Sequence, residues 1–127
     1  MLDRRLFISV AAALCAVPAL AADKKPFADA AFDAAIKAGK PVFVEVTAPW
    51  CPTCRAQAPH ISAVTGDARF KGLTVFTVDF DSQKDVLKRL NVQRQSTLIA
   101  FKGGKETGRS TGDTDAGRIK ALIETTL

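Results

Sequence analysis

The feature that most constrains this chain is a pair of cysteines placed directly after a strongly apolar segment. Residues 42–46 are β-branched or aromatic with one exception, a composition typical of a buried strand. Cys51 and Cys54 follow after a short connection, and residues 55–64 are expected to form a helix that bends at Pro59. The sequence therefore predicts a strand that delivers two closely spaced cysteines to the start of a helix.

A thiol at a helix start is favoured in its charged form, because free backbone N–H groups and the helix dipole stabilise a negative sulfur there. Cys51 is therefore predicted to attack disulfides as a thiolate. Cys54 lies one turn further on and is close enough to attack the resulting mixed disulfide and release the substrate. Trp50 places a flat apolar surface beside the reactive sulfur.

Two other functions are compatible with the cysteine pair. A structural zinc site needs four ligands, and Cys51, Cys54 and His60 supply three, so a metal-binding or metal-delivery module would need a ligand from a partner chain. A binding adaptor with an incidental cysteine pair would keep its activity when both cysteines become serine. The position of the pair between a strand and a helix favours redox chemistry over both, with no metal ligands assigned.

The first 21 residues have the pattern of an export signal. Arg4 and Arg5 precede an apolar, Ala-rich run over residues 7–20, and small residues at positions 19 and 21 suit a signal peptidase. The arginine pair is equally compatible with twin-arginine export. These features predict a signal peptide over residues 1–21, and they place the protein in the bacterial periplasm.

Removal of that signal would leave residues 22–127 as one domain. Cys15 would be lost with the signal, and two cysteines as close as the remaining pair cannot form a structural disulfide framework. Anchoring through an uncleaved signal is less favoured, because the apolar run is shorter than the roughly 20 residues of a spanning helix and contains Pro18. No stable membrane insertion is expected after cleavage.

Composition fits a single globular domain and argues against nucleic-acid binding. The chain has 127 residues, of which 47% are hydrophobic and 24% are charged, which is sufficient for one core. Its net charge of +5 is not gathered into a basic stripe with interleaved aromatic residues, so nucleic acid is not an expected partner. We expect a monomer.

The rest of the pattern alternates helices and strands. Further helices are expected over residues 27–40, 81–90 and from 113 onward, and further strands over residues 73–80, 97–101 and 106–110. Asp81 or Ser82 is expected to cap the second of these helices, and Gly103-Gly104 predicts a hairpin turn. Residues 22–26 look too short and polar for a strand. The result is an α/β fold with a mixed central sheet of about four strands and helices on both faces.

The segment around the cysteines resembles the thioredoxin family. Residues 42–55 are similar to that family's active-site strand and helix start, and Pro59 matches its helix-kinking proline. Residues 96–104 and Gly112 resemble its loop, hairpin and site glycine, and the similarity extends from about residue 27 to residue 127. The resemblance implies a thioredoxin-like three-layer fold and the activity of a protein dithiol–disulfide oxidoreductase.

The same resemblance implies partners and site residues. Substrates would be protein thiols and disulfides, and electrons would pass to or from a redox partner protein. The redox-active Cys51–Cys54 disulfide would need no added cofactor. Six residues would shape the substrate groove: Trp50, Pro52, Thr53, Ser96, Thr97 and Gly112. Whether the natural direction is oxidation, reduction or isomerisation depends on the partner and stays open.

Two departures from the family pattern concern the cysteines directly. Pro52 and Thr53 stand where thioredoxin has Gly-Pro, a dipeptide that tunes the reduction potential. The hydroxyl and N–H of Thr53 are expected to favour the Cys51 thiolate and to make the disulfide more oxidising. Glu45 stands in place of a buried aspartate, which implies that it accepts the proton of Cys54; a carboxylate in an apolar strand suits that role.

The third departure is Ser96, which occupies the position of the family's cis-proline. A cis bond before a residue other than proline costs about 3–4 kcal/mol, which favours a trans Gln95–Ser96 bond and a reshaped groove. Serine also brings a hydroxyl close to the sulfurs, where it would alter substrate choice or leave room for a metal ion.

Overall fold

The structure is a computed structural model that describes residues 21–127. The predicted signal peptide, residues 1–21, lies outside the described residues apart from its last position. The elements are β1 (Asp23–Pro26), α1 (Asp29–Lys37), β2 (Val42–Thr47), α2 (Pro52–Thr65), a 3-10 turn (Ala68–Phe70), β3 (Thr74–Asp79), α3 (Lys84–Arg89), β4 (Thr97–Lys102), β5 (Lys105–Thr111) and α4 (Ala116–Glu124).

The strands form one mixed sheet in the order β1-β3-β2-β4-β5. β1 and β2 both run parallel to β3, and β4 runs antiparallel to β2 and to β5. The expected mixed sheet and the hairpin expected at Gly103-Gly104 are therefore confirmed. Gly103 and Gly104 form the hairpin turn with φ of 59° and 80°, backbone angles that residues with a Cβ rarely adopt.

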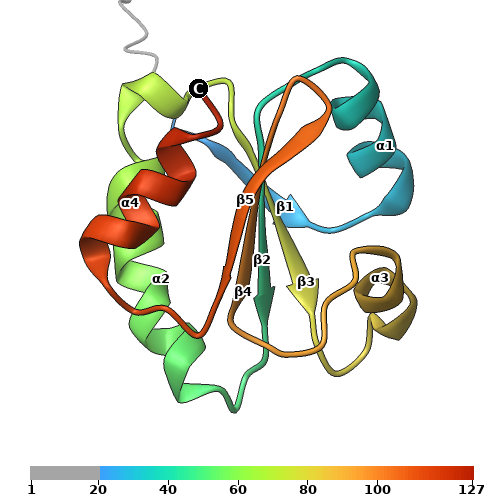
Figure 1. The fold of residues 1–127 in the computed structure, drawn as a ribbon, viewed down its shortest axis with the longest axis vertical. Coiled ribbons are helices and arrows are strands. Elements are labelled where there is room, and N and C mark those ends of the chain that lie inside the picture. The colour runs from blue at the N-terminus through green and yellow to red at the C-terminus, as the bar shows by residue number, and fades with distance from the viewer. Residues whose placement is uncertain (1–20) are drawn as a thin grey trace, which may run out of the picture.

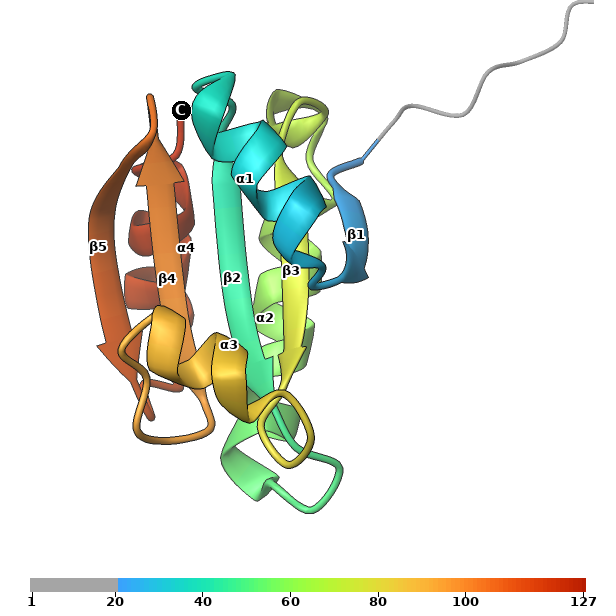
Figure 2. The same ribbon diagram turned by 90° about the vertical axis from the view of Figure 1, so that its right-hand side faces the viewer.

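Helices cover both faces of the sheet, so the fold has three layers. Figure 1 shows the sheet with α2 and α4 on one side and α1 and α3 on the other. Figure 2 shows α1 and α3 in front of the strands, with α2 and α4 behind them. The predicted α/β architecture with helices on both faces is confirmed.

Alternation along β2 explains the two cores. Val42, Val44 and Val46 join the apolar cluster that contains residues of α1 and α3, whereas Phe43 joins the cluster that contains Ile61 of α2 and residues of α4. Successive side chains of a strand point to opposite faces of a sheet. A strand in the middle of a covered sheet is therefore apolar at nearly every position, as residues 42–46 are.

The sheet has five strands, one more than expected, because residues 23–26 form β1. Every residue of β1 is exposed, so its side chains carry no apolar signal. The strand is held by backbone pairing to the edge of β3, extended at its ends by hydrogen bonds from Asp23 N to Leu73 O and from Phe27 N to Thr77 O. Pro26 is tolerated because an edge strand leaves one side unpaired.

The expectation that Asp81 or Ser82 caps α3 is wrong. That helix begins at Lys84, its N-cap position is Gln83, and no side chain caps it. Ser82 Oγ instead donates to a carboxylate oxygen of Asp79 at 2.8 Å. Asp81 accepts from Trp50, so both polar side chains organise the loop after β3 instead of the helix.

Four connections lie at one end of the molecule. They join β2 to α2, β3 to α3, α3 to β4, and β5 to α4, and Figure 1 shows them at the lower end of the sheet. Residues far apart in sequence are thus brought to the carboxyl end of β2. Within residues 21–127, no helix is both long and apolar enough to cross a membrane.

Candidate active site

Cys51 and Cys54 form a disulfide at the start of α2. Cys51 is the N-cap residue, and its Sγ accepts a hydrogen bond from the backbone N–H of Cys54 at 3.1 Å. Pro52 occupies the first turn, where a backbone N–H would make no hydrogen bond within the helix, so its absence costs nothing there. The sulfur of Cys51 therefore occupies the place where a helix start normally binds an oxygen or an anion.

Both cysteines are buried in this state, with exposed fractions of 1% for Cys51 and 7% for Cys54. Their environments differ in hydrogen bonding. Cys51 Sγ faces the N–H of Cys54, whereas Cys54 Sγ lies 3.9 Å from the carbonyl oxygen of Val46. A backbone N–H stabilises a thiolate and a carbonyl oxygen stabilises a thiol, so negative charge is favoured on Cys51.

Ser96 lies over the disulfide. Its Oγ is 3.1 Å from Cys51 Sγ and 3.1 Å from Cys54 Sγ, and the residue is buried. The part of the chain that the structure describes contains no cis peptide bond, so the bond that joins Gln95 to Ser96 is trans. Ser96 instead has a φ of 61°, which lets the chain turn into β4 without a cis bond.

The backbone of Ser96 is held on both sides. Its N–H donates to the carbonyl oxygen of Val46 at 2.8 Å, and its carbonyl oxygen accepts from the N–H of Gly112 at 3.1 Å. Gly112 has a φ of 75° and lies in the connection between β5 and α4. The loop before β4 is therefore attached to the strand beside it and to the loop before α4.

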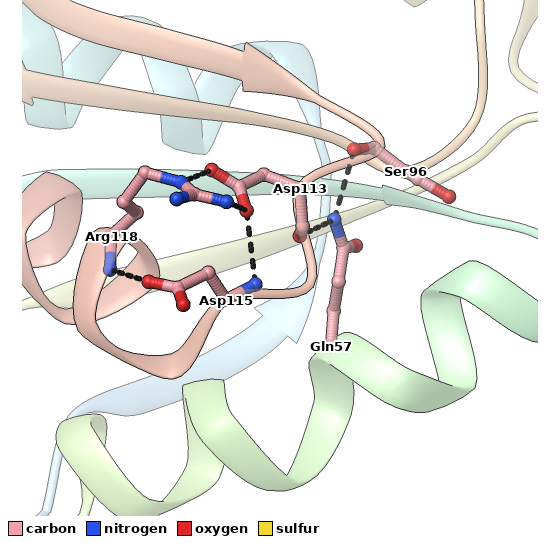
Figure 3. A network of polar contacts seen from close by, with 5 residues as sticks. All are labelled: Gln57, Ser96, Asp113, Asp115 and Arg118. Carbon is pink, nitrogen blue, oxygen red and sulfur yellow. Dashed lines mark hydrogen bonds and ion pairs between the residues drawn. The ribbon is translucent and has the colours of Figure 1, made fainter.

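Gln57 joins this arrangement from α2, and sequence reasoning missed it. Its Nε2 donates to the carbonyl oxygens of Ser96 at 3.2 Å and of Asp113 at 2.8 Å, as Figure 3 shows. The residue is 2% exposed. The helix period gave a usable signal, because Cys54, Gln57 and Ile61 share one face of the helix and an amide on a buried face needs a partner.

The loop before α4, which Gln57 contacts at the Asp113 carbonyl, is stabilised by an ion pair. Arg118 of α4 donates to both carboxylate oxygens of Asp113, at 2.8 and 3.1 Å, and Figure 3 shows this paired geometry. These bonds, with a further one from the N–H of Asp115, hold the pKa of Asp113 below its usual value. The same pair raises the pKa of Arg118. Asp113 is thus charged at neutral pH and keeps the loop attached to α4.

Trp50 supplies the apolar surface next to the disulfide. The residue is 52% exposed, and its Nε1 donates to the carboxylate oxygens of Asp81 at 2.9 and 3.1 Å. Its ring and that of Phe80 form a T-shaped pair, with ring centroids 6.4 Å apart. Asp81 is therefore a second residue that sequence reasoning did not place at the site; it orients the tryptophan.

Glu45 is buried in β2, but its polar contacts lead away from the cysteines. Its Oε1 lies 2.8 Å from Nζ of Lys24 in β1 and accepts a hydrogen bond from Thr77 Oγ1 at 3.2 Å. The period of the strand puts Glu45 on the same face as Phe43, which is the face that α2 covers. Its role toward Cys54 stays a prediction.

Among the residues that the structure describes, Pro52, Thr53 and Thr97 make no side-chain hydrogen bond to either cysteine, and their groove role stays a prediction. Thr97 Oγ1 donates to the carbonyl oxygen of Arg94 at 2.7 Å and lies 3.1 Å from the hydroxyl of Thr111. Pro52 is exposed and Thr53 is half-buried at the helix start. Residues 21–127 hold no group of three or more His, Cys, Asp and Glu side chains placed to bind a metal ion.

Comparison with known proteins points to one family. A family model described as Thioredoxin matches residues 23–125. A thioredoxin from Echinococcus granulosus is 36% identical over 95 residues, covering 74% of this chain and 85% of that protein. A Thioredoxin H-type from Oryza sativa subsp. indica is 33% identical over 93 residues, covering 73% and 75%. The crystal structure of Trxlp from Edwardsiella tarda superposes with a TM-score of 0.77 at 38% identity, covering 80% of this chain and 98% of that one.

Proposed function

This chain belongs to the thioredoxin family and is a dithiol–disulfide oxidoreductase, and on that premise we propose that it exchanges disulfides with protein substrates outside the cytoplasm. The observation that carries the proposal is the Cys51–Cys54 disulfide at the first turn of α2, where the helix start favours a thiolate. The redox centre is the chain's own disulfide, and electrons are exchanged with a partner protein such as a reductase.

In the reducing direction, the Cys51 thiolate attacks one sulfur of a substrate disulfide. The substrate S–S bond breaks, a mixed disulfide forms, and the departing sulfur takes a proton from water. Cys54 then loses its proton and attacks Cys51 Sγ, so the Cys51–Cys54 bond forms and the second substrate sulfur departs. Two electrons have passed from the dithiol to the substrate. The same steps in reverse oxidise a substrate dithiol.

Exposure does not identify the attacking thiol, because Cys51 is the more buried of the two cysteines. Hydrogen bonding assigns this role to Cys51. Its sulfur accepts from a helix N–H, and that of Cys54 lies near a carbonyl oxygen. We assign the proton of Cys54 to Glu45, which is buried on the α2 side of β2. Lys24 Nζ lies 2.8 Å from this carboxylate, and the Lys24 side chain is 55% exposed.

Protein substrates are favoured by the exposed surface of Trp50. Trp50 and Leu127 are the large hydrophobic side chains exposed within residues 21–127, and Trp50 adjoins the disulfide. An exposed tryptophan held by a hydrogen bond is a rigid surface for a peptide to pack on. Pro52, Thr53, Ser96, Thr97 and Gly112 complete the proposed groove.

A trapping experiment tests the reaction. The Cys54→Ser variant should accumulate mixed disulfides through Cys51, because the resolving thiol is gone, and these should be seen as reducible adducts on gels. The Cys51→Ser variant should form none and should not reduce insulin disulfides. Adducts that form with Cys51→Ser but not with Cys54→Ser would reverse the assigned roles. A wild-type protein that forms no reversible disulfide would overturn the function and favour the metal-binding alternative.

Export is proposed from the pattern of residues 1–21, and location in the bacterial periplasm follows from it. Mass spectrometry of the full chain expressed in a bacterium should find the periplasmic form shortened by those residues. Replacing Arg4 and Arg5 with lysine should block twin-arginine export but leave general secretion intact. Recovery of the uncut chain in the cytoplasm would contradict the proposal.

A further inference from the structure

We propose that Ser96 is a catalytic residue, whose hydroxyl donates a hydrogen bond to whichever sulfur carries negative charge, and that Gln57 is the positioning residue that holds it there. The proposal rests on the thiol–disulfide exchange described above. Ser96 Oγ lies 3.1 Å from both Cys51 Sγ and Cys54 Sγ, so it can serve either without moving the backbone.

The chemistry of sulfur makes this hydrogen bond state-dependent. A hydroxyl has one proton to donate, and a disulfide sulfur is a weak acceptor for it. A thiolate is a much stronger acceptor, because hydrogen bonds to charged groups are shorter and stronger. The bond is therefore strong while Cys51 is a free thiolate, weakens as Cys51 attacks, and strengthens again when Cys51 departs in the reverse step. Interactions that strengthen along a reaction accelerate it, so the Ser96 hydroxyl accelerates the departure of Cys51. Before attack, the same hydroxyl raises the thiolate fraction of Cys51.

The backbone of Ser96 is held in an unfavourable conformation that keeps the hydroxyl in place. A φ of 61° is disfavoured for a residue with a Cβ. Three hydrogen bonds maintain it: Ser96 N donates to Val46 O, and Ser96 O accepts from Gly112 N and from Gln57 Nε2. Strained backbone held by several surrounding contacts is common at reactive sites.

Gln57 connects this loop to the helix that carries the cysteines. Its Nε2 uses both protons, one toward the Ser96 carbonyl and one toward the Asp113 carbonyl, as Figure 3 shows. Asp113 is itself attached to α4 through Arg118. The separation between the sulfurs and the Ser96 hydroxyl is thus set from α2, which carries Cys54 three residues before Gln57.

The consequence is a more oxidising disulfide. A donor that favours the thiolate over the disulfide stabilises the reduced state, and it also raises the thiolate fraction of Cys51 at neutral pH. Removing the hydroxyl should lower both the reduction potential and the thiolate fraction of Cys51. Removing the Gln57 amide should lower both as well, because it displaces the Ser96 hydroxyl.

The test compares reduction potentials against glutathione mixtures for the full chain carrying Cys15→Ser, so that only Cys51 and Cys54 exchange. Ser96→Ala should lower the equilibrium constant for reduction about tenfold, which corresponds to about 30 mV for a two-electron couple. Ser96→Gly removes the same hydroxyl and relieves the φ of 61°, so it should shift the potential equally even if Ser96→Ala folds poorly. In both variants, the pH above which Cys51 is alkylated rapidly should be higher than in the parent.

Gln57→Met keeps the volume of the side chain and removes its donor, and it should shift the potential in the same direction by a smaller factor. Combined with Ser96→Ala it should add nothing further, because Gln57 acts through Ser96. Thr126→Val is the matched control: it removes another buried hydroxyl, one bonded to Ile123 O and remote in sequence from the disulfide, and should leave the potential unchanged.

Folded Ser96→Ala and Ser96→Gly variants with the parent's potential and alkylation profile would overturn the role of Ser96. A shift in these variants that is absent from Gln57→Met would overturn the role of Gln57. A parent protein that never equilibrates with glutathione would overturn the oxidoreductase function itself, a result distinct from the first two because it appears before any variant is compared.

Discussion

At the scale of single residues, the chemistry of the site depends on which polar group faces each buried atom. Cys51 Sγ meets the N–H of Cys54, and both sulfurs meet the hydroxyl of Ser96. Glu45 meets Lys24 and Thr77. Every buried side-chain nitrogen and oxygen atom of the described residues has a hydrogen-bond partner. In a buried site each missing partner is costly, so single substitutions here should have large and specific effects.

Glu45→Gln should slow the second step of the exchange. The amide cannot accept the proton of Cys54, and positioned acid–base groups commonly contribute a hundredfold or more, so we expect release from the mixed disulfide to slow about a hundredfold. Stopped-flow measurement of substrate release over the neutral pH range would report the step directly. Thr77→Val, which removes a donor to Glu45 but keeps the carboxylate, is the control and should have a smaller effect. Unchanged release rates in Glu45→Gln would rule out the proton role.

At the scale of elements, loops that are distant in sequence depend on one another. The loop before β4 and the loop before α4 are bonded through Ser96 and Gly112 and are bridged by Gln57. Asp115 caps α4 by accepting from the N–H of Arg118 at 2.8 Å. The geometry around the disulfide therefore depends on the start of α4, which itself contributes no atom to the reaction.

Arg118→Met should weaken the molecule in a pH-dependent way. The Arg118 hydrogen bonds keep the pKa of Asp113 below that of the unfolded chain, so the pair stabilises the fold at pH values above the ordinary aspartate pKa. This contribution is lost as the pH falls through the folded pKa and Asp113 becomes protonated. Urea midpoints at low salt should therefore be lower for the variant at neutral pH and should converge with wild type in acid. A difference that stayed constant into strong acid would contradict this account.

At the scale of the whole molecule, the sheet separates two apolar cores. One lies between the strands and the α1 and α3 helices, and the other lies between the strands and the α2 and α4 helices. Figures 1 and 2 show these helix pairs on opposite faces of the sheet. The three central strands, β3, β2 and β4, are each paired on both sides. We therefore expect a substitution in one core to be felt weakly in the other.

Leu87→Ala and Ile123→Val test this independence. Leu87 of α3 and Ile123 of α4 are buried in different cores. The first should cost about 2–5 kcal/mol of unfolding free energy and the second about 0.5–1.5 kcal/mol, because of lost burial and residual cavities. Urea unfolding of the double variant should give the sum of the two within about 0.5 kcal/mol. A larger discrepancy would mean that the sheet couples the two cores.

The sequence by itself determined every helix, the four strands β2 to β5 and the position of the disulfide. The apolar run of β2, the cysteine spacing at the start of α2 and the Gly103-Gly104 turn are each set within a few neighbouring residues. Strand alternation and positive φ at glycine are local effects, and local patterns predict them. The α/β layering then follows from the order of these elements.

Only the tertiary structure decided the edge strand β1 and the groups that surround the sulfurs. β1 has no apolar side-chain signal and forms because the edge of β3 offers backbone partners. The Ser96 hydroxyl reaches sulfurs more than 40 positions earlier in the chain, and the Gln57 amide reaches a carbonyl 39 positions later. Such contacts depend on how separate layers pack, because a polar side chain takes the nearest partner that the assembled fold presents, and no local pattern specifies that partner.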